Sequence, residues 1–328
     1  MLMVVTGSDD ATADLVLEQL AKDGHPCFRL NSETFPSDLA ISVDFQGEHA
    51  SGCIHCAGRS ITLDNIDTVW FRKPNGPGIS SSVTNPQARA FAERESTAFL
   101  SSVYRLLGDR FWVSHPDAIR KANDKLHQLA TAKRLGFAIP RTVVTNDPDT
   151  ALEFCRSSNM PKAIKPLKAG IVDYPDGRVE LIYTSLLTPD DLHNIHQVAF
   201  APCLLQEYVE KKHEVRVTVI GRSVVAVGLD TQGSDASRHD WRRENCRYVR
   251  YFETSIPTEL ERKICEFMDC YDVEFSAFDF IVTPAGEYVF LENNPNGQWA
   301  WLDLAIHNGL IGKMAAFLKT GGRSEHRR

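Results

Sequence analysis

The sequence has no long apolar run and no sign of an export signal. No window approaches the roughly 18 consecutive apolar residues that a membrane-spanning helix needs. The opening segment 1–7 is too short for the apolar core of a signal peptide, and it lacks the charged flank. We therefore expect a soluble protein that remains in the cytoplasm and has no membrane partner.

The chain also has no excess of basic residues. It carries 36 lysines and arginines against 43 aspartates and glutamates, a formal net charge of −7 over 328 residues. Because nucleic-acid binding requires a basic face that neutralises phosphates, this balance argues against a nucleic-acid partner. Apolar residues make up 43% of the chain, enough for two or three domains with buried cores, which excludes intrinsic disorder.

Cysteines are few, and a glycine-rich nucleotide fingerprint is missing. Eight cysteines in a chain of this length, without an export signal, predict reduced thiols. The single CxxC at 53–56 has no second pair at zinc-ribbon spacing, so it is a weak match to a metal or redox motif. Gly7 stands alone after the first apolar run, which predicts an ordinary strand-to-helix turn rather than a dinucleotide site.

What the chain does contain is a mixture of α/β and α+β patterns. Residues 1–115 alternate strands and helices and predict a βα domain, and residues 116–203 predict a small α+β unit. Residues 204–320 are rich in strands, and the polar tail 321–328 is expected to be disordered. The expected helices span residues 13–22, 86–107, 116–135, 148–156, 189–196, 258–270 and 301–318.

The strongest group of candidate functional residues lies late in the chain. Asp279 stands between phenylalanines on one strand, and Glu292 and Asn294 end the next strand. Alternation puts Glu292 and Asn294 on one side, and a hairpin can bring Asp279 beside them. Three oxygen donors at a sheet edge suit Mg²⁺, which waters and substrate phosphates complete. The alternative is a turn-rich strand end, which fits poorly because charges within apolar strands need partners.

Two earlier segments carry polar groups suited to a nucleotide. Lys165 ends an apolar strand, and the loop that follows it contains Lys168 and Gly170. A lysine in this place can reach phosphates, although a lysine at a strand end is usually just solvated. The strand 205–209 is followed by the charged turn 210–214.

Taken in order, these elements resemble an ATP-grasp ligase that carries an N-terminal βα (pre-ATP-grasp) domain. The resemblance rests on residues 124–125 with the helix after them, Lys165, the segment 206–209, the strand 214–219 and the late acidic group. It implies ATP and Mg²⁺ as cofactors. It further implies the following contacts: ATP phosphates at Lys125 and Lys165, adenine at the backbone of Gln206, Glu207, Tyr208 and Val209, ribose at Glu214, and Mg²⁺ at Asp279, Glu292 and Asn294.

Shorter segments resemble one group of these ligases, the ATP-grasp maturases of ribosomally made peptides known as the microviridin or graspetide group. Those segments are residues 67–74, 112–116, 145–147, 239–242 and 294–299, the last reading Asn-Pro-Asn-Gly-Gln-Trp. The chain departs from the group at Phe71, where tyrosine is common, and at Asn293, where an aliphatic residue is usual. The loop after Lys165 is also poor in glycine.

This resemblance implies a reaction and a partner. ATP would phosphorylate an Asp or Glu side chain of a precursor peptide, and a Ser or Thr hydroxyl or a Lys amine of the same peptide would displace phosphate. The products would be ω-ester or ω-amide macrocycles. The partner would be a precursor peptide with a leader and a core, and the enzyme is expected to be a homodimer.

Several charged residues are candidates for catalysis or substrate binding. Arg216 and Arg242, together with Lys165, could neutralise the phosphate or clamp the substrate carboxylate. The alternative for Arg216 is a surface arginine on an edge strand. Arg72 follows a strand end of the first domain, where it either meets an acidic substrate segment or pairs structurally.

The helix expected at 189–196 carries Asp190, Asp191 and Asn194. In keeping with the resemblance it could dock a helical leader, although an N-cap with a solvated face is the better prediction from sequence. Trp299 and Trp301 open the last expected helix and are predicted to pack in the core rather than to stack on a base.

Two other functions are compatible with the same nucleotide residues. One is an ATP-grasp ligase that adds an amino acid to a protein terminus or a small molecule. The segments 239–242 and 294–299 argue against this function. The other is a non-catalytic subunit that only binds the precursor peptide. Such a subunit would tolerate loss of the metal ligands, and since all three are present, catalysis is the simpler interpretation.

Overall fold

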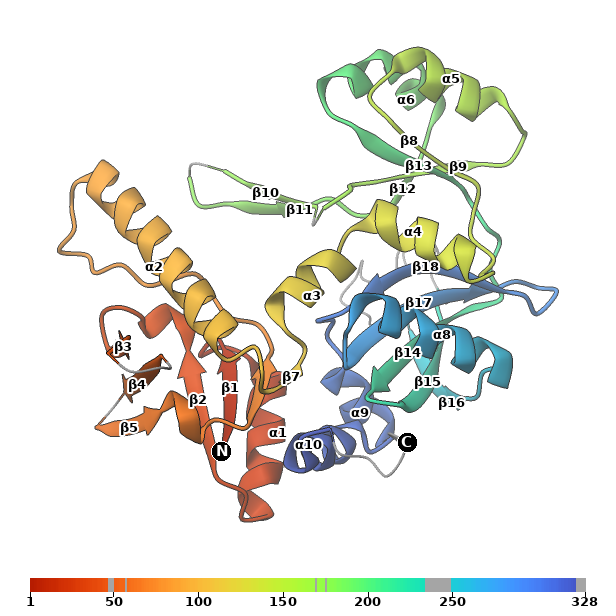
Figure 1. Ribbon diagram of the computed structural model, residues 1–328. Coiled ribbons are helices and arrows are strands. Elements are labelled where there is room, and N and C mark those ends of the chain that lie inside the picture. The colour runs from red at the N-terminus through yellow and green to blue at the C-terminus, as the bar shows by residue number, and fades with distance from the viewer. Residues whose placement is uncertain (47–49, 57, 169, 175, 234–248, 323–328) are drawn as a thin grey trace.

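A computed structural model describes residues 1–328 except 47–49, 57, 169, 175, 234–248 and 323–328. Arg242, Cys246 and most of the predicted polar tail therefore lie outside the described residues. The strands of the described part form five sheets, of which three are large enough to organise the molecule (Figure 1). No helix in this part of the chain is long and apolar enough to cross a bilayer.

The N-terminal domain is built on a parallel sheet in the order β2-β1-β6-β7. Its strands are β1 (Leu2–Thr6), β2 (Cys27–Asn31), β6 (Thr68–Phe71) and β7 (Phe111–Val113). Leu2 and Val4 of β1 pack on the side of α1 (Ala11–Lys22), whereas Met3 and Val5 pack on the side of α2 (Pro86–Leu106). Burial on both faces explains why β1 is apolar at every position rather than alternating.

A small antiparallel sheet flanks this domain. It consists of β3 (Leu39–Asp44), β4 (Ser51–Cys56) and β5 (Arg59–Thr62), with the short turns η1 (Ser32–Thr34) and η2 (Leu63–Asn65) beside it. Both cysteines of the CxxC segment lie in β4, and all seven described cysteines are free thiols.

The prediction of one continuous helix at 116–135 is wrong. The structure has two helices, α3 (Pro116–Ala122) and α4 (Lys125–Arg134). The break occurs because Asp124 caps α4, its side chain accepting from the backbone N–H of His127 at 3.0 Å. Both helices pack on the C-terminal part, α3 on α8 and α4 on β18.

The central unit has a four-stranded antiparallel sheet in the order β12-β9-β13-β8. Its strands are β8 (Thr142–Thr145), β9 (Lys162–Lys165), β12 (Ser185–Leu186) and β13 (Cys203–Glu207). The helices α5 (Pro148–Arg156) and α6 (Pro189–His193) and the turn η3 (Ile195–Phe200) accompany it. A hairpin of β10 (Ile171–Asp173) and β11 (Val179–Leu181) projects away from the sheet (Figure 1).

The C-terminal part is a five-stranded antiparallel sheet in the order β16-β15-β14-β17-β18. Its strands are β14 (His213–Ile220), β15 (Ser223–Asp230), β16 (Arg250–Thr254), β17 (Phe275–Val282) and β18 (Tyr288–Asn294). A hydrophobic core lies between this sheet and α8 (Thr258–Tyr271). It contains Val215, Val217 and Val219 of β14 and Phe278 and Phe280 of β17. Alternation therefore turns Arg216 and Asp279 to the opposite face of the same sheet.

The last predicted helix, 301–318, is also divided in the structure, into α9 (Ala300–Ile306) and α10 (Leu310–Thr320). The buried Asp303 carboxylate stabilises the break, because it accepts from the N–H groups of Gly309 and Ile311, each at 2.7 Å. Helix α10 packs against α1 of the N-terminal domain. Helix α10 thus lies between the N-terminal domain and the C-terminal part and connects them (Figure 1).

Candidate functional site

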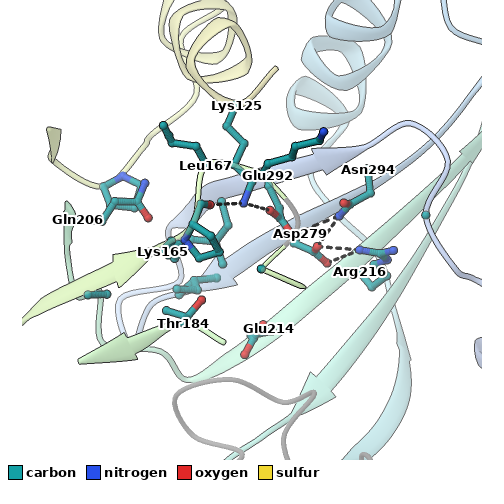
Figure 2. Close-up of a pocket in the computed structure, with 18 of the residues that line it drawn as sticks. Lys125, Lys165, Leu167, Thr184, Gln206, Glu214, Arg216, Asp279, Glu292 and Asn294 are labelled. Carbon is teal, nitrogen blue, oxygen red and sulfur yellow. Dashed lines mark hydrogen bonds and ion pairs between the residues drawn. The ribbon is translucent and has the colours of Figure 1, made fainter. Parts of the chain in front are cut away.

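One cleft of about 710 Å³ collects most of the predicted site residues. Its walls come from the central sheet, the C-terminal sheet and the start of α4 (Figure 2). Lys73 of the N-terminal domain also lines it. The predicted residues that line it are Lys125, Lys165, Gln206, Glu207, Tyr208, Val209, Glu214, Arg216, Asp279, Glu292 and Asn294. Residues as far apart in the sequence as Lys125 and Asn294 are therefore brought to a single polar surface.

The acidic group predicted at the sheet edge forms as expected. Asp279 and Glu292 are direct partners across the β17–β18 hairpin. Asn294 lies beside both, and its Nδ2 donates to Asp279 Oδ2 at 3.1 Å and to Glu292 Oε1 at 3.4 Å. All three side chains face the cleft (Figure 2). The hairpin thus places two carboxylates and one amide together.

This donor set has the chemistry that Mg²⁺ requires. Two carboxylates and an amide supply hard oxygen ligands, and turning the Asn294 amide by half a revolution presents its oxygen in place of its nitrogen. The set is open to the cleft on one side, which leaves room for the waters and phosphates that normally complete a Mg²⁺ shell. The residues present therefore fit the predicted metal.

Arg216 is fixed against this acidic group. Its side chain is only 5% exposed, and Nη1 donates to both carboxylate oxygens of Asp279 at 2.7 Å. Nη2 donates to the backbone oxygen of Gln298 at 3.1 Å. Strand β14 lies between β15 and β17, so the alternative of a surface arginine on an edge strand is wrong. Arg216 holds the segment 296–298 and Asp279 in one arrangement.

The opposite end of the cleft is formed by the segment after β13. The N–H groups of Glu207 and Tyr208 donate to Arg141 O at 2.9 Å and Pro161 O at 2.8 Å. These two N–H groups are therefore used within the protein, and contact of the backbone of segment 206–209 with an adenine stays a prediction. A backbone N–H for the base would have to come from Val209, which also lines the cleft.

Glu207 and Gln206 have structural partners in the central sheet. The Gln206 side chain donates to Thr142 Oγ1 at 2.9 Å. Ser158 Oγ donates to Glu207 Oε1 at 2.6 Å, and this hydrogen bond is the largest cause of a lowered pKa of Glu207, with Lys162 and Arg141 adding to it. These contacts fix the segment that ends β13.

Buried and partly buried lysines line the cleft near this end. The ammonium of Lys211 forms an ion pair with Glu214, and both side chains are less than one-tenth exposed. Lys125 Nζ donates to Pro166 O at 3.0 Å and lies 3.6 Å from Glu292 Oε2. Lys165 reaches the cleft from the end of β9 (Figure 2). Lysines thus line the same cleft as the acidic group, and Lys125 lies directly beside it.

Arg72 joins the N-terminal domain to this site without lining the cleft. It is 1% exposed, Nη1 donates to Asn296 O at 3.0 Å, and Nη2 donates to the Gln298 side chain. Its Nε lies 3.7 Å from Asp10 Oδ2. Burial is the largest cause of a lowered pKa of this guanidinium. Of the two predicted alternatives, the structure favours structural pairing over contact with a substrate.

The sequence analysis assigned no role to the neighbour of Arg72, Lys73, which does line the cleft. Its position in the segment 67–74 was a signal, since that segment carried part of the resemblance. Trp301 also lines the cleft and contacts Tyr251, whereas Trp299 is fully buried. Both tryptophans therefore pack in the core as predicted, and Trp301 lies at its edge beside the cleft.

The predicted leader-docking residues lie outside the cleft. Thr188 and Asp191 form a reciprocal capping box at the start of α6, and Asn194 Nδ2 donates to Asp190 O at 3.0 Å. The helix ends at His193 rather than continuing to residue 196. These local contacts agree with the N-cap that the sequence favoured.

A strand-end lysine of one antiparallel sheet that faces an Asp, Glu and Asn set on another defines an ATP-dependent ligase of the ATP-grasp class. Comparison with known proteins extends this. Residues 1–120 match the family model described as the MvdD pre-ATP grasp domain.

Two solved structures and one curated sequence are similar to nearly the whole chain. The Chryseobacterium gregarium RiPP-associated ATP-grasp ligase, in complex with ADP and a leader and core peptide, has a TM-score of 0.90 and 29% identity, covering 97% of this chain and 96% of that one. Macrocyclase MdnB from Microcystis aeruginosa MRC has a TM-score of 0.79 and 30% identity, covering 97% and 98%. The probable alpha-L-glutamate ligase of Enterobacter sp. (strain 638) is 23% identical over 286 residues, 83% of this chain and 86% of its own length. The chain thus belongs to the ATP-grasp ligases that macrocyclise ribosomally made peptides.

Proposed function

We propose that this protein is an ATP- and Mg²⁺-dependent ligase that closes ω-ester or ω-amide rings in a precursor peptide. The observation that carries the proposal is the cleft itself, in which lysines and the acidic group line one space of about 710 Å³. The ADP and the leader and core peptide held by the Chryseobacterium gregarium relative support both halves of the proposal.

The nucleotide occupies the side of the cleft formed by the central sheet. Val209 and its neighbours receive the base, and Glu214, oriented by Lys211, accepts from the ribose hydroxyls. Lys125 and Lys165 bind phosphate oxygens as point charges. Asp279, Glu292 and Asn294 hold Mg²⁺, which when bound neutralises the charge of the β- and γ-phosphates.

The first chemical step joins the substrate to phosphate. A carboxylate oxygen of the peptide forms a bond to the γ-phosphorus, the bond from that phosphorus to the bridging oxygen breaks, and ADP leaves. Arg216 is nearest to the acidic group and, with Lys165, stabilises the negative charge on the transferring phosphoryl group. Arg242, which lies outside the described residues, is proposed to help bind the substrate carboxylate or phosphate.

The second step closes the ring. A hydroxyl or amine of the same peptide attacks the acyl carbon, the carbon–oxygen bond to phosphate breaks, and the nucleophile loses its proton. Each linkage therefore removes one water from the peptide and consumes one ATP. Holding both reacting groups in one cleft replaces an encounter in solution by a reaction within one complex.

The leader of the peptide is proposed to bind the central unit. Asp190 and Leu192 are exposed on α6, and the hairpin β10–β11 exposes Ile171, Val179 and Leu181 to an extent of half or more of each side chain. A leader with an apolar face and a basic residue would complement these side chains. Asp191 and Asn194 would then shape α6 through their local hydrogen bonds.

We also propose that the protein acts as a homodimer in the cytoplasm, where ATP and ribosomal peptides meet.

The test of the function is a mass measurement. The purified protein is incubated with ATP, Mg²⁺ and the short peptide encoded beside its gene that carries Ser, Thr or Lys and Asp or Glu in its core. We expect the peptide to lose one water per linkage, and the Glu292→Gln variant to produce no loss. An unmodified peptide, together with ATP turnover on a free amino acid, would contradict the proposal.

A second candidate function is ligation of a free amino acid, which the similarity to a probable alpha-L-glutamate ligase favours. It would add the mass of one glutamate residue to an acceptor instead of removing water. Including free glutamate in the same incubation distinguishes the two reactions.

A further inference from the structure

Lys73 stands where the N-terminal domain forms one wall of the cleft. It follows β6, and its backbone oxygen accepts from the N–H of Gly7 at 2.9 Å. The preceding Arg72 is bonded to the segment 296–298, so the main chain at this point is fixed to both the first sheet and the C-terminal part. The ammonium therefore starts from a rigid base while its side chain still reaches solvent.

Most other cations of the cleft are already paired within the protein. Arg216 is bonded to Asp279, Lys211 to Glu214, and Lys125 to Pro166 O and Glu292. Lys165 also has an interaction partner. In the part of the chain that the structure describes, only Lys73 and Lys168 line the cleft without a side-chain hydrogen bond or ion pair. Lys168 belongs to the loop directly after Lys165, which the proposed function assigns to the ATP phosphates.

A peptide carboxylate that enters this cleft meets the negative charge of the ATP phosphates. The carboxylates of the cleft, Asp279, Glu292 and Glu214, already engage the cations beside them. Unit charges a few ångströms apart in a partly desolvated site interact by several kcal/mol, so a carboxylate needs a cation close to it. The cation must not be one that the phosphates occupy, and among the described residues that line the cleft this leaves Lys73, on the wall formed by the N-terminal domain.

We propose that Lys73 binds the Asp or Glu carboxylate of the core peptide that is to be phosphorylated. This inference rests on the proposed function and assigns a substrate-binding residue for its first step. Lys73 holds one carboxylate oxygen while the other bonds to the γ-phosphorus and the bond to ADP breaks. In the resulting acyl phosphate the oxygen beside Lys73 is the carbonyl oxygen, on which charge develops when the second nucleophile attacks.

The surroundings of Lys73 are consistent with this role. Desolvation by the walls of the cleft is the largest cause of a lowered pKa of its ammonium, and the charge of Arg72 adds to it. Asp10 and Asp9 oppose the shift. A substrate carboxylate would compensate the remaining cost of holding a cation there, which gives binding energy specific to an acidic side chain.

The experiment compares two core peptides. Because a leader would dominate the affinity, it is supplied as a separate peptide, and binding of the synthetic core segment is measured with ADP and Mg²⁺ present. One core carries its native Asp or Glu, and the other carries Asn or Gln. We expect the wild-type protein to prefer the acidic core by about tenfold and Lys73→Met to bind both cores equally.

Two control variants and one kinetic measurement make the outcome specific. Lys73→Arg should retain most of the preference, because it keeps the cation. Lys133→Met removes an exposed lysine of α4 that does not line the cleft, and should behave as wild type. In turnover, Lys73→Met should raise KM for the precursor peptide by about tenfold while KM for ATP stays within about twofold.

A tenfold preference that survives in Lys73→Met would overturn the inference, and so would a rise in KM for ATP alone. Failure of the wild-type protein to cyclise the peptide would instead contradict the proposed function. Cyclisation by wild type and Lys73→Met with equal parameters would refute the role of Lys73 and leave the proposed function intact.

Discussion

Asp279 lies directly opposite Glu292 in the β17–β18 ladder, and both carboxylates face the cleft instead of the phenylalanine-rich core on the other side of the sheet. Arg216 and Lys125 each approach one member of the pair, at 2.7 Å and 3.6 Å. Two carboxylates at neighbouring positions repel each other, and a divalent cation bound between them turns this repulsion into a net attraction.

Replacing Glu292 by glutamine should therefore reduce Mg²⁺-dependent ATP turnover by about 100-fold or more, because one hard ligand is lost at the point where phosphate charge develops. Turnover at increasing Mg²⁺ concentration measures this. The matched control is Glu287→Gln, an exposed glutamate in the turn of the same hairpin, which should leave turnover unchanged. Equal turnover in wild type and Glu292→Gln would contradict the metal assignment.

Arg216→Ala should abolish peptide product while leaving the affinity for ATP nearly intact, since its bonds go to Asp279 and Gln298 rather than to the base or ribose end. The partly buried Asp279 loses its arginine partner and keeps the hydrogen bond from Asn294, which should lower the free energy of unfolding by about 3 kcal/mol. Mass spectrometry, ATP binding and urea denaturation check the three statements. A large loss of ATP affinity would instead put Arg216 in the nucleotide site.

Gly297 is placed where a larger residue would disturb this arrangement. A Cβ at Gly297 would lie 2.7 Å from Arg216 Nη2 and 3.0 Å from Asn294 Cβ. Gly297→Ala should therefore lower product formation by about tenfold or more through displacement of Arg216. Gly312→Ala is the control, because nothing lies within 4 Å of its Cβ position in α10, and it should raise stability by up to about 1 kcal/mol. Unchanged activity in Gly297→Ala would show that Arg216 need not be held so closely.

Lys211→Met leaves the buried Glu214 without its cation, and it should both raise KM for ATP by about tenfold and lower the free energy of unfolding by about 3 kcal/mol. The double variant Lys211→Met/Glu214→Leu replaces the pair by apolar side chains and should regain stability without regaining ATP affinity. Normal ATP affinity in the double variant would contradict ribose binding at Glu214.

The Ser158–Glu207 hydrogen bond predicts a pH dependence of stability. Because the pKa of Glu207 is lowered in the folded state from its usual 4.5, its contribution is present above that pH and is lost as the pH falls through the folded-state pKa. Ser158→Ala removes the largest cause of the lowering. Urea midpoints at pH 7 and below pH 4.5 should therefore differ more in wild type than in Ser158→Ala, and equal differences would contradict the assignment.

Local patterns predicted much of the site because the chemistry follows from strand alternation and short connections. Glu292 and Asn294 are two residues apart on one strand, and a tight turn brings Asp279 across from them. Helix boundaries were less accessible. The caps at Asp124 and Asp303 divide two predicted helices, and the apolar periodicity runs on through both breaks. The role of Arg72 was left open because its partners lie more than 200 residues away.

The sequence by itself predicted the class of the fold and the acidic group of Asp279, Glu292 and Asn294, which follows from residue types at close spacing, whereas Lys125 and Lys165 were predicted through the resemblance to ATP-grasp ligases. Only the tertiary structure decided that Arg72 is buried between two sheets, that α10 closes onto α1, and that Lys73 and Trp301 line the cleft. These facts depend on contacts between segments distant in the chain. Packing and charge pairing between domains decide these contacts, and a local sequence pattern does not predict which distant segment a residue will contact.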